Sequence, residues 1–144
     1  MPQAPLPAEL ARFLLGARPA VIATARADGS PHSAPCWYEW ADDRVLVTMD
    51  ADGPRARRIQ RNPHVALSVL GKNWYNHLSL LGRVVEMRDD PDLADIDRLS
   101  TRYLGGPYHD RDYHGVSALI EIDWWHTWGD PAREANRLRA AKGR

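Results

Sequence analysis

In the segment from Val116 to Trp128 an apolar side chain stands at every second position up to Trp124. The alternating residues are Val116, Ala118, Ile120, Ile122 and Trp124. Because successive side chains of a strand point to opposite faces of a sheet, this pattern predicts a β-strand whose buried face includes Trp124. The chain is therefore expected to contain a sheet that receives this strand.

Five further segments have the composition and the boundaries of strands. They are residues 19–26, 32–40, 44–48, 64–70 and 74–88. Asp28-Gly29 between the first two predicts a tight turn and hence a hairpin. Pro31 and Pro35 remove backbone donors, so the second strand is expected at a sheet edge or with a bulge. Gly82 is expected to allow a bend or bulge in the fifth strand.

Short helices are predicted between the strands, over residues 7–15, 54–62 and 89–103. Asp residues at the start of the third helix complement the positive end of its dipole, so the acidic run 89–97 is expected to cap that helix. Six strands in mostly local succession, with short helices between them, favour a mainly β fold. The expected architecture is a small closed or partly open antiparallel barrel.

Length and composition indicate one globular domain. A chain of 144 residues, 44% hydrophobic and 26% charged, can bury a core without disulfides, and its one cysteine excludes an internal disulfide framework. We expect a capping helix in residues 1–17, the barrel in 18–129 and an Arg/Ala-rich tail in 130–144. A signal peptide is not evident and no apolar run approaches the roughly 20 residues of a membrane span, so a cytoplasmic protein is expected.

Charge and aromatic content narrow the class of ligand. Nineteen Lys plus Arg balance 19 Asp plus Glu, which argues against a dedicated nucleic-acid binder or a membrane-surface protein. Of the 19 basic residues 17 are Arg, and six Trp stand against a single Phe. Arg and Trp are the side chains that bind phosphates and planar rings, so their positions are informative.

The most informative stretch runs from Thr48 to Pro63, where a predicted strand leads through Gly53-Pro54 into an Arg-rich helix. The arginines of this helix are Arg55, Arg57, Arg58 and Arg61. A helix N-terminus with guanidinium groups offers the N–H donors and the positive charge that a phosphate requires. The stretch predicts a site for an anionic ligand. The alternative is a solvated Arg-rich helix face, which is common on protein surfaces.

Four segments carry a resemblance to a known family. They are Ala-Thr-Ala-Arg-Ala-Asp-Gly-Ser-Pro-His-Ser-Ala-Pro-Cys-Trp at 23–37, Arg-Ala-Arg-Arg-Ile-Gln-Arg-Asn-Pro-His-Val-Ala-Leu-Ser-Val at 55–69, Leu-Gly-Arg-Val-Val-Glu at 81–86 and Trp-His-Thr-Trp-Gly at 125–129. In this order and spacing they resemble the pyridoxamine 5′-phosphate oxidase-like split-barrel flavoproteins, in particular the branch that uses the deazaflavin coenzyme F420. The resemblance covers residues 18–129 and implies a homodimeric, six-stranded antiparallel split β-barrel.

The resemblance also implies an activity. Such proteins bind FMN or coenzyme F420 at the subunit interface and transfer a hydride to or from a small organic substrate. The cofactor ring carries the reaction, while the protein captures the phosphate, orients the ring and excludes water, so no catalytic residue is named. Two alternatives remain: a non-catalytic flavin- or haem-binding protein on the same barrel, and a small nucleic-acid-binding barrel that uses Arg55 to Arg61 and the Trp residues.

Matching the family's phosphate-binding helix residue by residue gives roles to three arginines. Arg55 takes its first basic position and Arg57 its second. Arg58 stands where the family commonly has Asn, which leaves the role of this residue open. The same resemblance places His32, Pro35 and Trp37 of the hairpin beside the cofactor ring.

The implied contacts of the cofactor ring come from two strands. His32, Pro35 and Trp37 of the hairpin are expected to line the ring, and Thr48 and Met49 to approach the ring and the ribityl chain. A strand interrupted by proline leaves backbone groups free to bond the polar edge of a flavin. Trp37 is equally compatible with a place in the barrel core; alternation puts it on the opposite face from Trp40, so one of the two is expected outside the core.

Four aromatic residues are implied to lie at a dimer interface, where they reach the cofactor of the other subunit. They are Trp74, Tyr75, Trp125 and Trp128. Burial in an interface accounts better for aromatic side chains at strand ends than exposure to water does. The alternative is a monomeric barrel closed by a Trp-rich plug.

Two other features carry no expected chemistry. His109-Asp-Arg-Asp-Tyr-His114 mixes imidazoles and carboxylates, but its spacing matches no zinc pattern, so a hydrated loop and no metal site are expected. Cys36 is expected to be a small buried apolar residue rather than a nucleophile.

Overall fold

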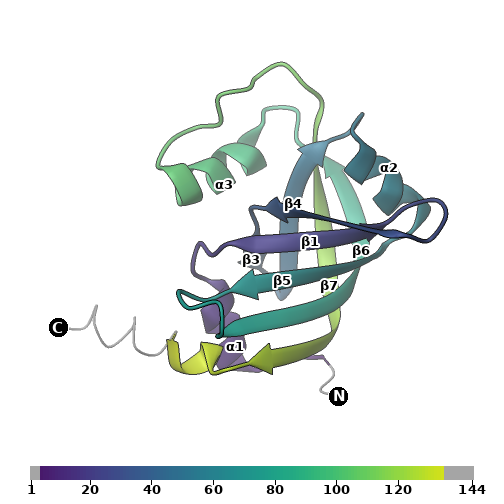
Figure 1. Ribbon diagram of the computed structural model, residues 1–144. Coiled ribbons are helices and arrows are strands. Elements are labelled where there is room, and N and C mark those ends of the chain that lie inside the picture. The colour runs from purple at the N-terminus through teal and green to yellow at the C-terminus, as the bar shows by residue number, and fades with distance from the viewer. Residues whose placement is uncertain (1–3, 135–144) are drawn as a thin grey trace.

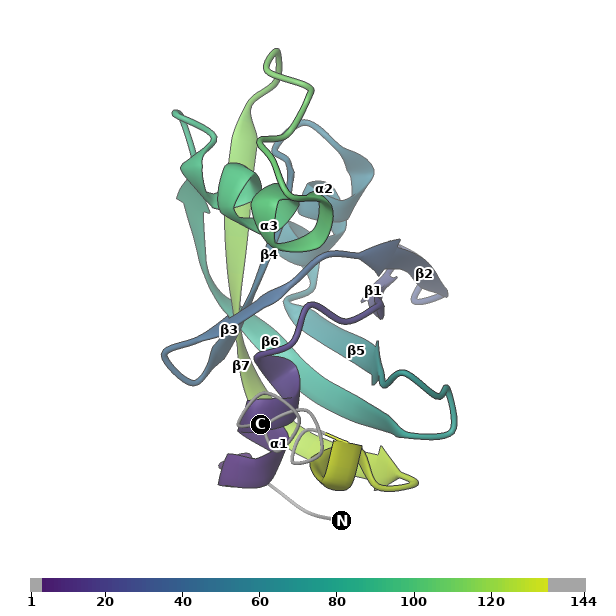
Figure 2. The same ribbon diagram turned by 90° about the vertical axis from the view of Figure 1, so that its left-hand side faces the viewer.

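A computed structural model describes residues 4–134 of the chain. Within these residues seven strands form one antiparallel sheet in the order β2-β1-β5-β6-β7-β4-β3, which curls into a barrel (Figures 1 and 2). The strands are β1 (Ala20–Ala25), β2 (Pro31–Cys36), β3 (Glu39–Ala41), β4 (Arg44–Asp50), β5 (His64–Leu70), β6 (His77–Asp89) and β7 (Gly115–Trp128). The helices are α1 (Ala8–Leu14), α2 (Pro54–Arg61) and α3 (Ala94–Leu104). The predicted mainly β, split-barrel fold with short helices is confirmed.

The two edge strands of the sheet, β2 and β3, follow one another in the chain with Trp37 and Tyr38 between them. Consecutive Cα atoms are about 3.8 Å apart, so three peptide steps keep these edges within about 11 Å of each other. The sheet must therefore curl until its first and last strands approach. Among the described residues no strand pairing joins β2 to β3, so the barrel is split along this line.

Trp37 and Tyr38 also explain why the described chain has one strand more than the sequence predicts. Residues 32–40, expected as a single strand, form β2 and β3 with a corner at Trp37-Tyr38, so the described chain has seven strands instead of six. β2 lies at a sheet edge, as Pro31 and Pro35 predict. An edge strand tolerates proline because its outer side needs no backbone donor.

Gly82 lies at a bulge in the β6–β7 pair, as its position in the sequence predicts. Leu81 pairs with Trp124 and Gly82 with Ile122, so Asp123 of β7 has no partner in β6. The residues of β7 after Asp123 therefore point to the face opposite to the one that simple alternation predicts. Trp125, rather than Trp124, packs against the core. The prediction that Trp124 continues the buried face is wrong, because the shift arises from the pairing of two strands and not from the alternation of one.

α1 closes one end of the barrel (Figure 1). Phe13 and Leu14 of this helix are fully buried, together with Tyr38. The Nε of Arg18 donates to the Phe13 carbonyl at 2.6 Å, and Nη2 of Arg102 donates to the Leu14 carbonyl at 3.3 Å. Two guanidinium groups thus satisfy carbonyls at the C-terminal end of α1, which has no further helical turn to bond them.

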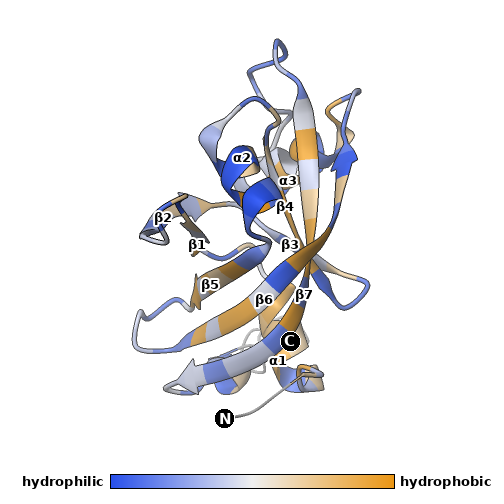
Figure 3. Ribbon diagram, turned by 90° about the vertical axis from the view of Figure 1, so that its right-hand side faces the viewer, coloured by the Kyte–Doolittle hydropathy of each residue, from blue (hydrophilic) through white to orange (hydrophobic). Residues whose placement is uncertain are grey.

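α3 packs on the face of the sheet that lies away from the barrel core. Leu99 of this helix joins Leu46 and Leu119 in a second apolar cluster. These two sheet residues alternate along β4 and β7 with residues of the core, such as Val47 and Ala118. The hydropathy of the ribbon alternates along β6 and β7, whereas α2 is strongly hydrophilic (Figure 3).

α3 begins at Ala94, a few residues later than the sequence predicts. Asp90 caps it, because its carboxylate accepts the backbone N–H of Asp95 at 3.0 Å and that of Ile96 at 3.2 Å. These bonds satisfy N–H groups that have no partner within the helix. The expectation that the acidic run caps this helix is confirmed for Asp90, whereas Asp89 bonds His114 and Asp97 bonds the loop after the helix.

Substitution of Gly82 tests the bulge. A Cβ atom at this position would meet the Glu121 carbonyl oxygen and would lie 3.0 Å from Cγ2 of Ile120, so backbone would have to move. We expect Gly82→Ala to lower the free energy of unfolding by about 1–3 kcal/mol, as overpacking does. Gly106→Ala is the control, because open space surrounds that position, and its effect should stay within about 0.5 kcal/mol. Urea denaturation measures both; equal effects of the two variants would contradict the packing argument.

Candidate functional site

A groove of about 710 Å³ lies beside the split of the barrel. It receives residues from β2, the β2–β3 corner, β4, α2, α3 and the loop that follows α3. The lining residues are Ala17, Pro19, Ala20, Pro35, Cys36, Trp37, Thr48, Arg55, Ile96, Tyr103, Leu104, Tyr108 and His109. Four residues of the sequence-based site, Pro35, Trp37, Thr48 and Arg55, are therefore brought together here.

One wall of the groove is aromatic. The rings of Trp37 and Tyr103 are stacked, with centroids 5.5 Å apart and planes inclined by 14°. Tyr108 meets Trp37 edge to face, with a centroid distance of 6.1 Å. Trp37 is half-buried and packs on the second apolar cluster, whereas Trp40 packs on the barrel core, which confirms that the two lie on opposite faces. Such a wall suits a planar ligand.

The groove also has a positive group, Arg55. Arg55 lies in the first turn of α2, and its guanidinium group has no hydrogen bond or ion pair with any residue between 4 and 134. No acidic residue lies in that first turn. A guanidinium group without a carboxylate partner, beside the N–H groups of a helix start, is a favourable environment for an anion.

The other two arginines of the predicted phosphate site behave differently. Arg57 is exposed, and its Nη1 donates to the carbonyl of Asp52 at 2.6 Å, so it supports the loop before α2 and does not line the groove. Arg58 lies 3.3 Å from Nδ1 of His32 through its Nη1. Since a guanidinium group can only donate, Nδ1 of His32 accepts this bond.

His32 lies on the positive side of the site and does not line the groove. The pKa of His32 is lowered below 6.5 by the charge of Arg58, by partial burial and by the charges of Arg26 and Arg55. The neutral imidazole is therefore favoured near pH 7. A nearby anion would offset these charges and make protonation easier.

Thr48 and Met49 point to opposite sides of β4. Thr48 is half-buried and borders both the groove and an adjoining recess of about 190 Å³. Met49 also borders the recess, but its side chain belongs to the barrel core and is 8% exposed. Of the two, Thr48 is the residue with a polar side chain available to a ligand in the groove.

The remaining aromatic residues of the predicted site lie elsewhere in the single chain. Trp74 borders a separate hollow, Tyr75 packs edge to face on Trp128 with centroids 6.2 Å apart, and Trp125 packs on the core. None of the four lines the groove. Trp74, Tyr75 and Trp128 are exposed by 79%, 61% and 52%, so these three aromatic side chains are free for an interface.

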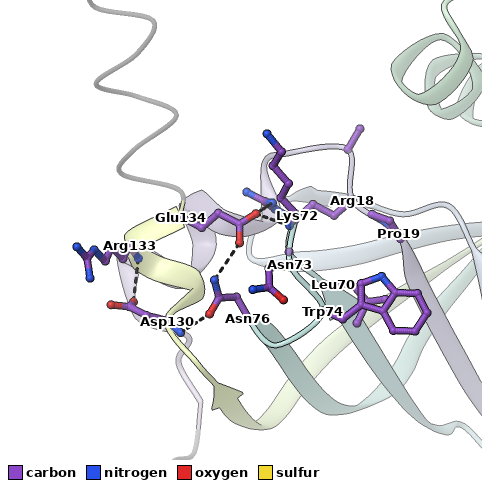
Figure 4. Close-up of a pocket in the computed structure, with 12 residues that line it drawn as sticks. Arg18, Pro19, Leu70, Lys72, Asn73, Trp74, Asn76, Asp130, Arg133 and Glu134 are labelled. Carbon is purple, nitrogen blue, oxygen red and sulfur yellow. Dashed lines mark hydrogen bonds and ion pairs between the residues drawn. The ribbon is translucent and has the colours of Figure 1, made fainter.

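The separate hollow has a volume of about 840 Å³, but its polar groups are largely paired with each other (Figure 4). The Glu134 carboxylate accepts from Nη1 of Arg18 at 3.2 Å and from the backbone N–H of Lys72. Asn76 accepts the backbone N–H of Asp130 at 2.9 Å. These bonds hold the β5–β6 turn against the segment after β7, which is a structural role, so we place the functional site in the smaller groove.

Several lining residues were not foreseen from the sequence. Tyr103 belongs to α3, which the sequence predicted only as a helix, and Tyr108 and His109 belong to the loop after it, for which no role in the site was expected. Cys36 also borders the groove, and burial raises the pKa of its thiol to about 11, which keeps it protonated and unreactive at pH 7. A cluster of aromatic residues in a Gly-rich loop was the available signal.

The described residues contain neither a cluster of metal-ligating side chains nor a membrane-spanning helix. Within the described residues no three His, Cys, Asp or Glu side chains are grouped as metal ligands. His114 instead bonds Asp89 through Nε2 at 2.8 Å. No helix in residues 4–134 is long and apolar enough to cross a membrane.

Solved structures resemble this chain over most of its length. An F420 reductase is 26% identical, with a TM-score of 0.76, and the match covers 85% of this chain and 98% of that one. A conserved hypothetical protein from Mycobacterium tuberculosis is 23% identical, with a TM-score of 0.68 and coverage of 93% and 89%. A pyridoxamine 5′-phosphate oxidase-related, FMN-binding protein from Nostoc punctiforme is 15% identical, with a TM-score of 0.54 and coverage of 78% and 74%. No curated protein sequence matches the chain.

The family comparison covers nearly all of the described structure. The model of the pyridoxamine 5′-phosphate oxidase family matches residues 6–129, which include every strand of the barrel and both ends of the groove. Together with the split barrel, this match agrees with the resemblance carried by the four sequence segments. The chain belongs to the pyridoxamine 5′-phosphate oxidase family.

Proposed function

We propose that this protein is an oxidoreductase that binds a flavin-type cofactor, FMN or coenzyme F420, and transfers a hydride to or from a small organic substrate. The observation that carries the proposal is the groove itself, which has an unpaired Arg55 at one end and the stacked Trp37 and Tyr103 along its wall. An anionic group and a planar ring in one molecule are what a phosphorylated flavin offers to such a groove.

The residues of the chain have distinct tasks in this proposal. Arg55 and the N–H groups of the first turn of α2 bind the phosphate. Trp37 and Tyr103 hold the ring, and Thr48 offers a hydroxyl to its polar edge or to the ribityl chain. The bound ring supplies the hydride chemistry, and the apolar wall keeps water away from it.

A homodimer is part of the proposal. Trp74, Tyr75 and Trp128 are exposed in the single chain and lie outside its own groove. Large exposed aromatic groups are unfavourable in water and typical of interfaces. In a dimer these residues of one subunit would complete the cofactor site of the other, as the resemblance implies for Trp74, Tyr75, Trp125 and Trp128.

Titration of the purified protein with FMN and with coenzyme F420 tests the proposed function. We expect saturable binding of one of them per subunit, detected by a change in absorbance near 450 nm or 420 nm, and the mass of a dimer in light scattering. A protein that takes up neither cofactor would contradict the proposal. A Soret band after addition of haem, without flavin binding, would favour the non-catalytic haem-binding alternative.

Replacement of Arg55 tests the phosphate end of the groove. Loss of a charge-assisted contact costs about 1.5–3 kcal/mol, so Arg55→Ala should weaken FMN binding roughly 10- to 150-fold. Riboflavin, which lacks the phosphate, should bind the variant as it binds the wild type. Arg61→Ala is the matched control, because Arg61 is exposed on the same helix and does not line the groove. Equal losses for FMN and riboflavin would show that Arg55 does not bind the phosphate.

The pKa of His32 reports on the positive end of the site. We expect NMR titration to give a pKa below 6.5, because Arg58 is the strongest influence on it, and Arg58→Ala should move it upward. Arg57→Ala should leave it unchanged, since Arg57 is turned to the Asp52 carbonyl. Inorganic phosphate should raise the pKa in the wild type, because a bound anion favours the imidazolium. If the pKa of His32 changed neither with added phosphate nor in Arg58→Ala, an anion site beside His32 would be contradicted.

A further inference from the structure

The loop that follows α3, residues 105–114, borders the groove but is weakly attached to the barrel. Gly105 ends α3 with a positive φ of 88°, and the chain then runs to β7 without helix or strand. Within the described residues, the hydrogen bonds that join residues 106–113 to the rest of the chain both end on one oxygen atom of Asp97. Among residues 4–134, Asp97 is therefore the one polar anchor of this part of the loop, which also packs on Trp37 through the Tyr108 ring.

Asp97 fixes both the N–H and, through Arg111, the carbonyl group of Tyr108 in the loop. Its Oδ1 accepts the backbone N–H of Tyr108 at 3.0 Å and Nη1 of Arg111 at 2.5 Å. The same Nη1 of Arg111 lies 3.3 Å from the carbonyl oxygen of Tyr108. Bonds to the N–H directly and to the carbonyl through a guanidinium group fix the orientation of this residue, and charge assistance makes them stronger than neutral hydrogen bonds.

Tyr108 is the loop residue with the largest part in the site. It borders both the groove and the adjoining recess, so it lies where the two meet. Its ring packs edge to face on Trp37, with planes at 86°, and on Tyr113, with planes at 78°. A shift of Tyr108 would change the width of the groove beside Trp37, the residue that holds the planar ring in the proposed function.

The packing of α3 does not depend on Asp97. The helix is capped by Asp90, and Ser117 of β7 donates to Asp95 at 2.7 Å. Leu99 lies in the second apolar cluster, and Nη2 of Arg102 bonds the Gly16 carbonyl at 2.6 Å. The side chain of Asp97 is 29% exposed and its pKa is lowered by its bonds to Arg111 and to the N–H of Tyr108. Loss of its charge would therefore act on the loop and leave the helix in place.

We propose that Asp97 is a positioning residue that fixes Tyr108 as the outer wall of the ring-binding part of the groove, and that it thereby sets the affinity for the planar ring of the ligand. This role rests on the proposed flavin-type function. It assigns the two ends of the groove to different residues: Arg55 selects the phosphate, and Asp97 acts through Tyr108 on the ring.

The test compares Asp97→Asn, Tyr108→Ala and the double variant. The ligands are FMN with riboflavin, and coenzyme F420 with its phosphate-free deazaflavin fragment. Asp97→Asn should weaken the binding of each cofactor and of its phosphate-free form by the same factor, about tenfold, because an aromatic contact is misplaced. The preference for the phosphorylated form, which depends on Arg55, should stay constant. Asp112→Asn is the matched control, since the Asp112 carboxylate has no hydrogen bond with any residue between 4 and 134.

The double variant separates positioning from a general effect on stability. If Asp97 acts through Tyr108, Asp97→Asn should add no further loss in the Tyr108→Ala background, whereas a structural role would add the same factor there. Asp97→Glu should restore part of the affinity, because it keeps the charge. Trypsin should also cut after Arg111 faster in Asp97→Asn than in the wild type, without any cofactor present.

Two results would overturn the proposed role of Asp97, and both can be told apart from the result that would overturn the proposed function. An additive loss in the double variant, or unchanged ring affinity and unchanged tryptic cleavage in Asp97→Asn, would show that Asp97 does not position Tyr108. A wild-type protein that binds neither cofactor nor either phosphate-free ligand would overturn the proposed function itself, and the role of Asp97 with it.

Discussion

The connection between the two sheet edges governs both the fold and the groove. Because only Trp37 and Tyr38 separate β2 from β3, the sheet has to curl, and the two side chains of this corner lie on opposite sides of it. Tyr38 is fully buried and donates its hydroxyl to the Gly16 carbonyl at 2.8 Å, which ties the corner to the end of α1. Trp37 faces the other way and becomes the wall of the groove. The closure of the barrel and the aromatic wall of the site thus come from one dipeptide.

Electrostatics explain why a chain of zero net charge has a positive site. The arginines that form ion pairs within the described residues lie outside α2, among them Arg18 with Glu134 and Arg98 with Glu39. The arginines of α2 have no carboxylate partner in residues 4–134, and the first turn of that helix has no acid. Charges that balance over the whole chain are thus separated in space. This separation leaves Arg55 available to an anion at the groove.

The sequence predicted what depends on local chemistry and missed what depends on pairing and packing. Alternation and turn residues predicted the strands, and the prolines predicted the edge position of β2. The bulge at Gly82 was expected, but its effect on Trp125 was not, because register is a property of two strands together. In the site, Arg55 and Trp37 were found from motifs, whereas Tyr108 was missed, because a tertiary bond to Asp97 brings its loop to the groove.

The residues that line the groove differ in how firmly they are attached to the barrel. Trp37 and Thr48 stand on or beside strands of the barrel, and Arg55 stands on α2, which packs Ala56 and Ile59 into the core. The loop 105–114 contributes no residue to the apolar core clusters of the described chain. Substitutions in this loop can therefore alter the outer wall of the groove without disturbing the core of the barrel. A cofactor in this groove would contact the barrel through Trp37 and Arg55 and the loop through Tyr108, so only the last of these contacts would depend on Asp97.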